Sequence, residues 1–150
     1  FLAFGRYRVS LFRQGEEGDY SLRLLDAGYV VRIGRAQPIH HYESPSRRLD
    51  HIVRFCTRNN ILFAWYNVPM PYFPIHLAAT TINSVRGGLR LGCGWSALRG
   101  AARGYMGILH ELPRRRPVSR QAYRLIRRLK TAGIIALDQI LPDLPPLRPL

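Results

Sequence analysis

The acidic residues of this chain gather in one short segment. GEEGDYSLRLLD, residues 15–26, holds four of the nine Asp and Glu residues of a 150-residue chain whose formal net charge is +14. One of these carboxylates could act as a general base on a hydroxyl nucleophile, while Arg23 keeps a second carboxylate ionised. The alternative is structural, because acids favour helix starts and a surface Asp19–Arg23 pair contributes only about 0.3 kcal/mol.

Two adjacent histidines, His40 and His41, are the second chemical candidate. Neighbouring side chains of an extended segment face opposite ways, so at most one of them is expected to act at a given site. That histidine would bind a divalent metal or contact a phosphate. The alternative is a hydrogen-bonded loop histidine. Since no second ligand follows at short spacing, a metal would need ligands from elsewhere in the chain.

The residue pattern predicts the elements that position these candidates. Apolar residues recur at helical spacing after Glu16 and Gly28 is a good stop signal, which predicts a helix over residues 16–28. FLAFGR (1–6) and YVVRIGRA (29–36) have the composition of strands. A helix, a strand and the histidine loop are therefore expected to follow one another.

The rest of the chain is predicted to be helical. An apolar stripe indicates a helix over about 45–66, and three prolines break the apolar run 61–82 into shorter helices joined by a bend. Further helices are expected near 94–110 and 118–131. The proline-rich end, LPDLPPLRPL (141–150), is expected to fray.

The basic excess restricts the partners. The sequence pI is about 11.1 and Lys130 is the only lysine, so the positive charge comes almost entirely from arginines. Such a charge indicates nucleic acid, an anionic membrane or a phosphate-bearing ligand as the partner. No nucleic-acid recognition motif accompanies them. Trp65 and Tyr66 lie in an apolar run beside basic helices, which favours an anionic membrane interface. The alternative is a solvated arginine face. Two cysteines form no disulfide framework or metal motif, as in a reducing cytoplasm.

The order of these motifs resembles a known family. GEEGDYSLRLLDAGYVVRIGRAQPIHHYESPSR (15–47), followed by RNNILFAWYNVPMP (58–71), resembles the C-terminal half of bacterial family 2 glycosyltransferases of the GT-A fold, of rhamnosyltransferase type. The resemblance covers about residues 1–75, and RRRPVSR (114–120) is similar to the tail of this group.

The resemblance implies an α/β fold. It places the C-terminal, acceptor-side part of a GT-A nucleotide-diphospho-sugar transferase domain at residues 1–85. A basic extension of amphipathic helices with a proline-rich tail would occupy residues 86–150. Since the sequence starts at Phe1, the N-terminal half with its nucleotide-binding units is expected to be missing, and this chain alone to be inactive.

The resemblance also assigns roles to residues. The second acid of the family's acidic pair is the catalytic base and matches Glu17, while Glu16 matches the first acid. Glu stands at position 17 where Asp is commoner, so either acid could be the base. Asp19 and Arg23 match residues that bind the acceptor or support the site. The histidine pair matches a region that contacts metal or diphosphate, with His41 preferred over His40.

The implied function is inverting transfer of a sugar from a nucleotide-sugar donor to a hydroxyl of a carbohydrate or lipid-linked acceptor. It would use Mg²⁺ or Mn²⁺, serve cell-surface polysaccharide or glycolipid synthesis, and take place at the cytoplasmic, inner face of the cell membrane. The alternative is a non-catalytic basic module that binds a membrane surface or another protein. Nucleic-acid binding through the arginines is a third interpretation.

Overall fold

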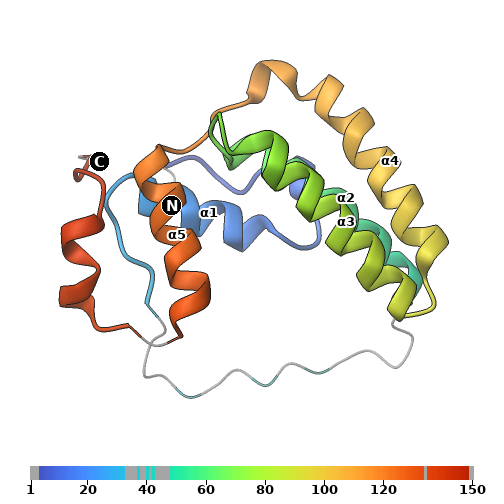
Figure 1. Cartoon of the computed structure of the whole chain (residues 1–150), viewed down its shortest axis with the longest axis horizontal. Helices are drawn as coiled ribbons and strands as arrows, with labels where there is room; N and C mark the ends of the chain where they lie inside the picture. Colours follow the sequence, from blue (N-terminus) through green and yellow to red (C-terminus); the bar gives the residue numbers. More distant parts are fainter. Residues whose placement is uncertain are drawn as a thin grey trace.

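Helices account for most of the structure. The computed structural model describes residues 4–32, 37, 40, 42, 48–133 and 135–148. Figure 1 shows two groups, with α1, α5 and the C-terminal segment on one side and α2, α3 and α4 on the other. The elements are the 3-10 helix η1 (Val9–Leu11), α1 (Glu16–Asp26), α2 (Leu49–Asn67), α3 (Phe73–Arg90), α4 (Gly94–His110), η2 (Leu112–Arg114), α5 (Arg120–Ala132), η3 (Leu137–Gln139) and η4 (Leu141–Asp143).

The predicted α/β fold, a partial GT-A domain, is wrong for the described residues, which contain no strand. At the chain start, guanidinium nitrogens of Arg23 bond the carbonyls of Phe4 (2.6 Å) and Arg6 (2.9 Å), where a strand would bond a neighbouring strand. Residues 29–32 form no ladder with any described segment, and 33–36 lie outside the description. A strand composition without a partner strand produces no sheet.

The helical predictions are confirmed with small shifts at the ends. Helix α1 ends at Asp26, and Gly28 adopts a φ of +85°, the left-handed conformation of a helix stop. Helix α4 has the predicted bounds, and α2 and α3 are the two helices on either side of the proline bend. The domain boundary predicted near residue 86 falls inside α3, and the division into two domains stays a prediction.

Small residues let α4 lie close to α2. Gly100 and Gly104 are buried on the face of α4 that contacts α2. A Cβ atom on Gly100 would stand 2.5 Å from the Arg54 carbonyl oxygen, and one on Gly104 would stand 2.9 Å from the Ile61 Cβ. The backbones therefore approach closely, and Leu11, Ile61 and Leu62 fill the core around the contact.

A second core joins α1 to α5. Leu22 and Leu25 of α1 pack with Ala122 and Leu125 of α5, together with residues from the ends of α2 and α3. The C-terminal segment, expected to fray, instead crosses the end of α1, where the Arg148 amide donates to the Ala27 carbonyl at 3.0 Å. Because a backbone hydrogen bond to a distant segment leaves no mark in the composition, the proline-rich sequence did not predict this contact.

The close approach of α2 and α4 predicts that Gly100→Ala destabilises the protein. The added methyl group meets a backbone oxygen that cannot move alone, so we expect a loss of about 1–3 kcal/mol in the free energy of unfolding, as for other overpacked cores. Urea denaturation measures this change.

Gly87→Ala is the matched control, because a Cβ at Gly87 in α3 has no atom within 4 Å. There the gain in helix propensity acts alone and should stabilise the protein by about 0.5–1 kcal/mol. Equal stabilisation by the two substitutions would contradict the tight helix contact.

Candidate functional site

A strained loop leads into the acidic segment. Arg13, Gln14 and Gly15 have φ values of +67°, +96° and +92°, a left-handed run that residues with side chains rarely adopt. The Asn59 side-chain nitrogen of α2 lies 2.8–3.3 Å from the four carbonyl oxygens of residues 11–14 and donates to them. This amide holds the loop in its unusual conformation from a helix that starts 34 positions after Gly15.

Two neighbours of Asn59 add to the attachment. Arg58 donates from Nη1 to the Ser10 carbonyl and to the Asn59 side-chain oxygen, both at 2.7 Å. The Cys56 thiol contacts the Gln14 side-chain oxygen. Asn59 itself is only 1% exposed. The RNN motif and the acidic motif, distant in sequence, are therefore in direct contact.

Asp19 is the buried centre of the segment. Its side chain has no exposed surface, and it accepts from Arg8 Nη1 (2.6 Å), Arg23 Nε (3.0 Å) and Asn67 Nδ2 (2.8 Å). These donors come from the segment before η1, from α1 itself and from the end of α2. The Asp19–Arg23 pair is thus buried. Of the two predicted roles, acceptor binding and structural support, this burial favours structural support.

Arg8 lies between this carboxylate and an aromatic ring. Its guanidinium carbon is 4.4 Å from the centre of the Tyr66 ring, a cation–π distance. Burial lowers the pKa of Arg8, and the adjacent Asp19 acts in the opposite direction. Burial also raises the pKa of Tyr66 to about 12, and its hydroxyl bonds the Ser10 hydroxyl at 2.7 Å. At neutral pH the site therefore holds a cationic Arg8 beside a neutral Tyr66.

Glu16 and Glu17 lie outside this network. Glu17 is exposed in the first turn of α1, and its carboxylate makes no hydrogen bond or ion pair with any described residue. Glu16 is half-buried, and its Oε2 atom is buried without a hydrogen-bond partner in the described part of the chain. A carboxylate in either position can accept a proton, so the choice of base between the two acids stays open.

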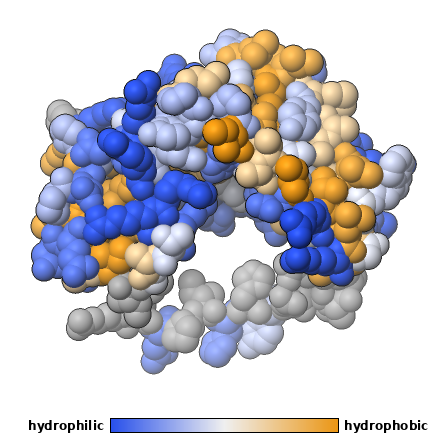
Figure 2. Space-filling view, viewed as in Figure 1, coloured by the Kyte–Doolittle hydropathy of each residue, from blue (hydrophilic) through white to orange (hydrophobic). Residues whose placement is uncertain are grey.

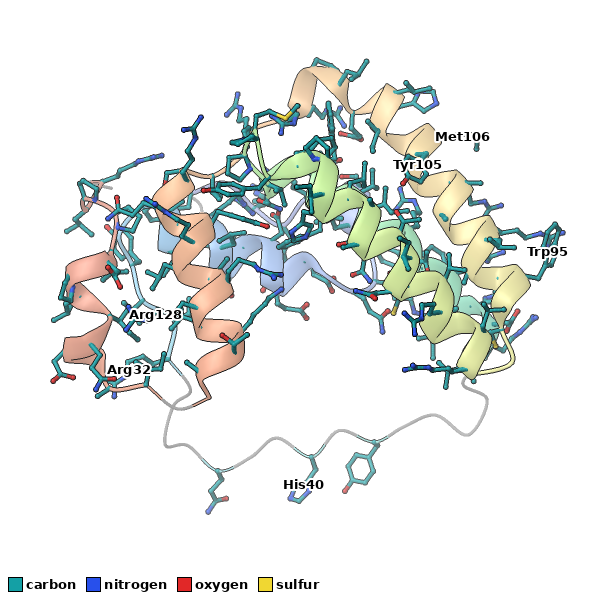
Figure 3. All side chains as sticks on the ribbon, in the orientation of Figure 1. Arg32, His40, Trp95, Tyr105, Met106 and Arg128 are labelled. Carbon is teal, nitrogen blue, oxygen red and sulfur yellow. The ribbon has the colours of Figure 1, made fainter. Side chains whose placement is uncertain are left out.

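His40 does not contact this site. His40 is exposed on the connection between α1 and α2, away from the helices in the view of Figure 3. His41 lies outside the described residues. Across residues 4–32, 37, 40, 42, 48–133 and 135–148, no three His, Cys, Asp or Glu side chains group as metal ligands would. The predicted metal site at His40 and His41 stays a prediction.

The outer side of α4 is a second candidate surface. An apolar strip of Trp95, Leu98, Tyr105 and Leu109 recurs at helical spacing and is 41–67% exposed. Figure 2 shows hydrophobic residues over the α3 and α4 side of the molecule, and Figure 3 shows Trp95 and Met106 on the outer side of α4. Among the described helices, none has the length and apolar character that crossing a membrane requires.

Arginines border the apolar strip. Arg99 and Arg103 are exposed on the adjacent strip of α4, and Arg99 lies over the Trp95 ring at 5.0 Å. The third side of the helix is the glycine-rich seam against α2. Helix α4 thus carries a buried, an apolar exposed and a basic exposed side, the pattern of a helix that lies at an interface.

Comparison with known proteins finds no family model, no curated protein and no solved structure that matches this chain. The site therefore rests on its own geometry.

Sequence reasoning missed Arg8, Asn59 and Asn67. Their partners lie 11 or more positions away, beyond the reach of local spacing. One signal was present, since asparagine is a poor helix former yet occurs at positions 59 and 67 of a long apolar helix. Such residues are often kept for side-chain hydrogen bonds.

The network around Asp19 predicts that Asp19→Asn destabilises the protein. The amide keeps the size of the side chain but removes the charge, which leaves Arg8 and Arg23 without their shared counter-ion. We expect a loss of about 3 kcal/mol, at the low end for a broken buried pair because both guanidinium groups keep some contact with water.

Glu17→Gln is the control, since it makes the same chemical change at an exposed position two residues away and should alter stability by less than about 0.5 kcal/mol. Denaturant unfolding of the two variants compares them. Similar stabilities for both would show that Asp19 does not anchor the segment.

Proposed function

We propose that this chain supplies the acceptor-side base of an inverting glycosyltransferase. The observation that carries the proposal is an exposed carboxylate, Glu17, on a helix start that is held by two separate networks. Asn59 holds the loop before it and Asp19 holds the helix after it. Catalytic groups need such support, because a misplacement of about 1 Å can cost a hundredfold in rate.

The chemistry needs one proton acceptor. The carboxylate takes the proton of the acceptor hydroxyl as its oxygen attacks the anomeric carbon of the donor sugar. A carbon–oxygen bond forms on one face of the sugar while the bond to the nucleoside diphosphate breaks on the other, which inverts the configuration. The leaving group, an anionic nucleoside diphosphate, is stabilised by positive charge. A carbohydrate or lipid-linked alcohol fits the acceptor role.

The proposal requires a donor-binding unit in addition to this chain. The described residues contain no parallel sheet of the kind that binds nucleotides at its strand ends. They also gather no metal ligands, so Mg²⁺ or Mn²⁺ would be held by the donor-binding unit. The chain alone should therefore show no turnover.

We expect Glu17→Gln to reduce kcat by about 10²–10⁴-fold, the usual contribution of a general base. The variant is made in a protein that joins this chain to the donor-binding unit, and release of nucleoside diphosphate from a panel of nucleotide sugars is measured. Glu16→Gln is measured in parallel, and the larger loss identifies the base.

Asp138→Asn is the matched control, because Asp138 is an exposed acid in η3 whose one hydrogen bond within the described residues comes from the Gln139 amide. Its kcat should not change. Unchanged kcat in both the Glu16 and Glu17 variants of an active enzyme would reject the base assignment.

We further propose that α4 holds the protein on the anionic inner surface of the cell membrane. The observation behind this second function is the apolar strip of α4 beside Arg99 and Arg103. Apolar side chains would enter the interface while arginines meet lipid phosphates, each worth about 1 kcal/mol. A membrane position would bring the Glu17 region toward lipid-linked acceptors. If the chain takes part in no sugar transfer, membrane binding through α4 would make it the non-catalytic membrane-surface module of the alternative interpretation.

Vesicle binding tests the membrane proposal. We expect the chain to prefer vesicles with phosphatidylglycerol over neutral phosphatidylcholine vesicles, and Trp95→Ser with Leu109→Ser to weaken binding by about tenfold or more. Val9→Ser removes an even more exposed apolar residue outside α4 and should have no effect. Equal binding to both vesicle types, or equal losses in both variants, would reject the proposal.

A further inference from the structure

A cleft between the α1 end and the start of α5 is unusually rich in arginine. It has a volume of about 490 Å³ and is formed by the segment before η1, the C-terminal end of α1, the η2–α5 connection and the C-terminal segment. Its volume lies in the range of small-molecule sites. Five arginines line it: Arg8, Arg23, Arg114, Arg116 and Arg148.

The carboxylates around the cleft do not balance these arginines. Asp19 is shared by Arg8 and Arg23, Asp26 pairs with Arg148 at 3.3 Å, and Glu111 pairs with Arg114 at 3.2 Å. Five guanidinium groups thus meet three carboxylates, which leaves an excess of two positive charges. A doubly charged anion would balance it.

Arg116 is the arginine best placed to receive such an anion. It is exposed, and within the described part of the chain it makes no hydrogen bond or ion pair. Pro117 follows it directly and limits its backbone, while Val118 is buried and its amide donates to the Asn67 carbonyl at 3.1 Å. The connection that carries Arg116 is therefore fixed at its C-terminal side.

Arg8 lines the same cleft, and several of its guanidinium N–H groups make no hydrogen bond to a described residue. Only its Nη1 atom bonds Asp19, and the Tyr66 ring supports its flat side. Arg23, in contrast, uses Nε, Nη1 and Nη2 on Asp19 and on backbone carbonyls. The Arg23 guanidinium group is therefore occupied by protein contacts, whereas Arg8 and Arg116 have donors left that can bind an anion.

We propose that this arginine cleft binds a multiply charged phosphate anion, either a diphosphate or a phosphate monoester. Guanidinium groups donate two parallel hydrogen bonds to phosphate oxygens, and a partly enclosed position strengthens each bond relative to open water. The anion is either a soluble phosphate compound or the phosphate of a lipid headgroup. The proposal does not depend on sugar transfer, since anion binding needs neither a donor sugar nor Glu17.

Titration calorimetry with inorganic pyrophosphate tests the soluble case on the full chain. We expect saturable binding with one site per chain, and Arg116→Gln to weaken it by about tenfold or more, the cost of a lost hydrogen bond to a charged group. Because Arg116 is exposed and makes no contact that holds the described fold, this variant should remain folded, which circular dichroism checks.

Arg90→Gln is the matched control, as Arg90 is an exposed arginine at the end of α3, outside the cleft. It should bind pyrophosphate as the unaltered chain does. Equal losses in both variants would mean general charge attraction and would reject the site.

Vesicles distinguish the two sources of phosphate. If the ligand is a lipid headgroup, Arg116→Gln should weaken binding to vesicles with phosphatidic acid, whose phosphate is a monoester, more than to vesicles with phosphatidylglycerol. A loss confined to inorganic pyrophosphate supports a soluble ligand. No effect of Arg116→Gln on pyrophosphate or on either vesicle would overturn the proposal.

Discussion

The buried charge of Asp19 is the constraint on which the arrangement of α1 depends. A carboxylate without contact to water is costly unless charged and polar groups surround it, and here three donors from separate segments do so. The same partners reach further, because Arg23 also holds the backbone at the chain start and Asn67 accepts from the segment before α5. One charge thus ties α1, α2 and both flanking connections together.

The hydrogen-bond network of this segment does not include its first two acids. The left-handed loop of residues 13–15 would relax on its own, but the Asn59 amide satisfies its carbonyl oxygens and keeps the strained form. The acids that directly follow are not part of that network, so their carboxylates face solvent or a half-buried space. The buried network and the accessible carboxylates are therefore separate parts of one short segment.

Local patterns predicted the helices because their apolar residues face a core at helical spacing, and α4 matches its expected bounds. The strands failed for a different reason. The segment around Phe4 has the composition of a strand, yet the Phe4 carbonyl, which a neighbouring strand would need as an acceptor, accepts from the Arg23 side chain. The i, i+4 spacing of Asp19 and Arg23 showed that they pair but not that they are buried. Two further partners of Asp19, Arg8 and Asn67, lie 11 and 48 positions away, and no local pattern contains them.

The concentration of acids in a basic chain follows from these contacts. Of the four acids between Glu16 and Asp26, Asp19 neutralises part of the charge of two arginines, and Asp26 accepts from the Ser119 amide at the start of α5 and pairs with Arg148. Two acids thus serve as counter-ions where arginine-bearing segments meet. That leaves Glu16 and Glu17 as the acids without a structural partner in the described part of the chain. The segment therefore contains two kinds of acid: counter-ions that line a cationic cleft, and carboxylates that pair with no described residue.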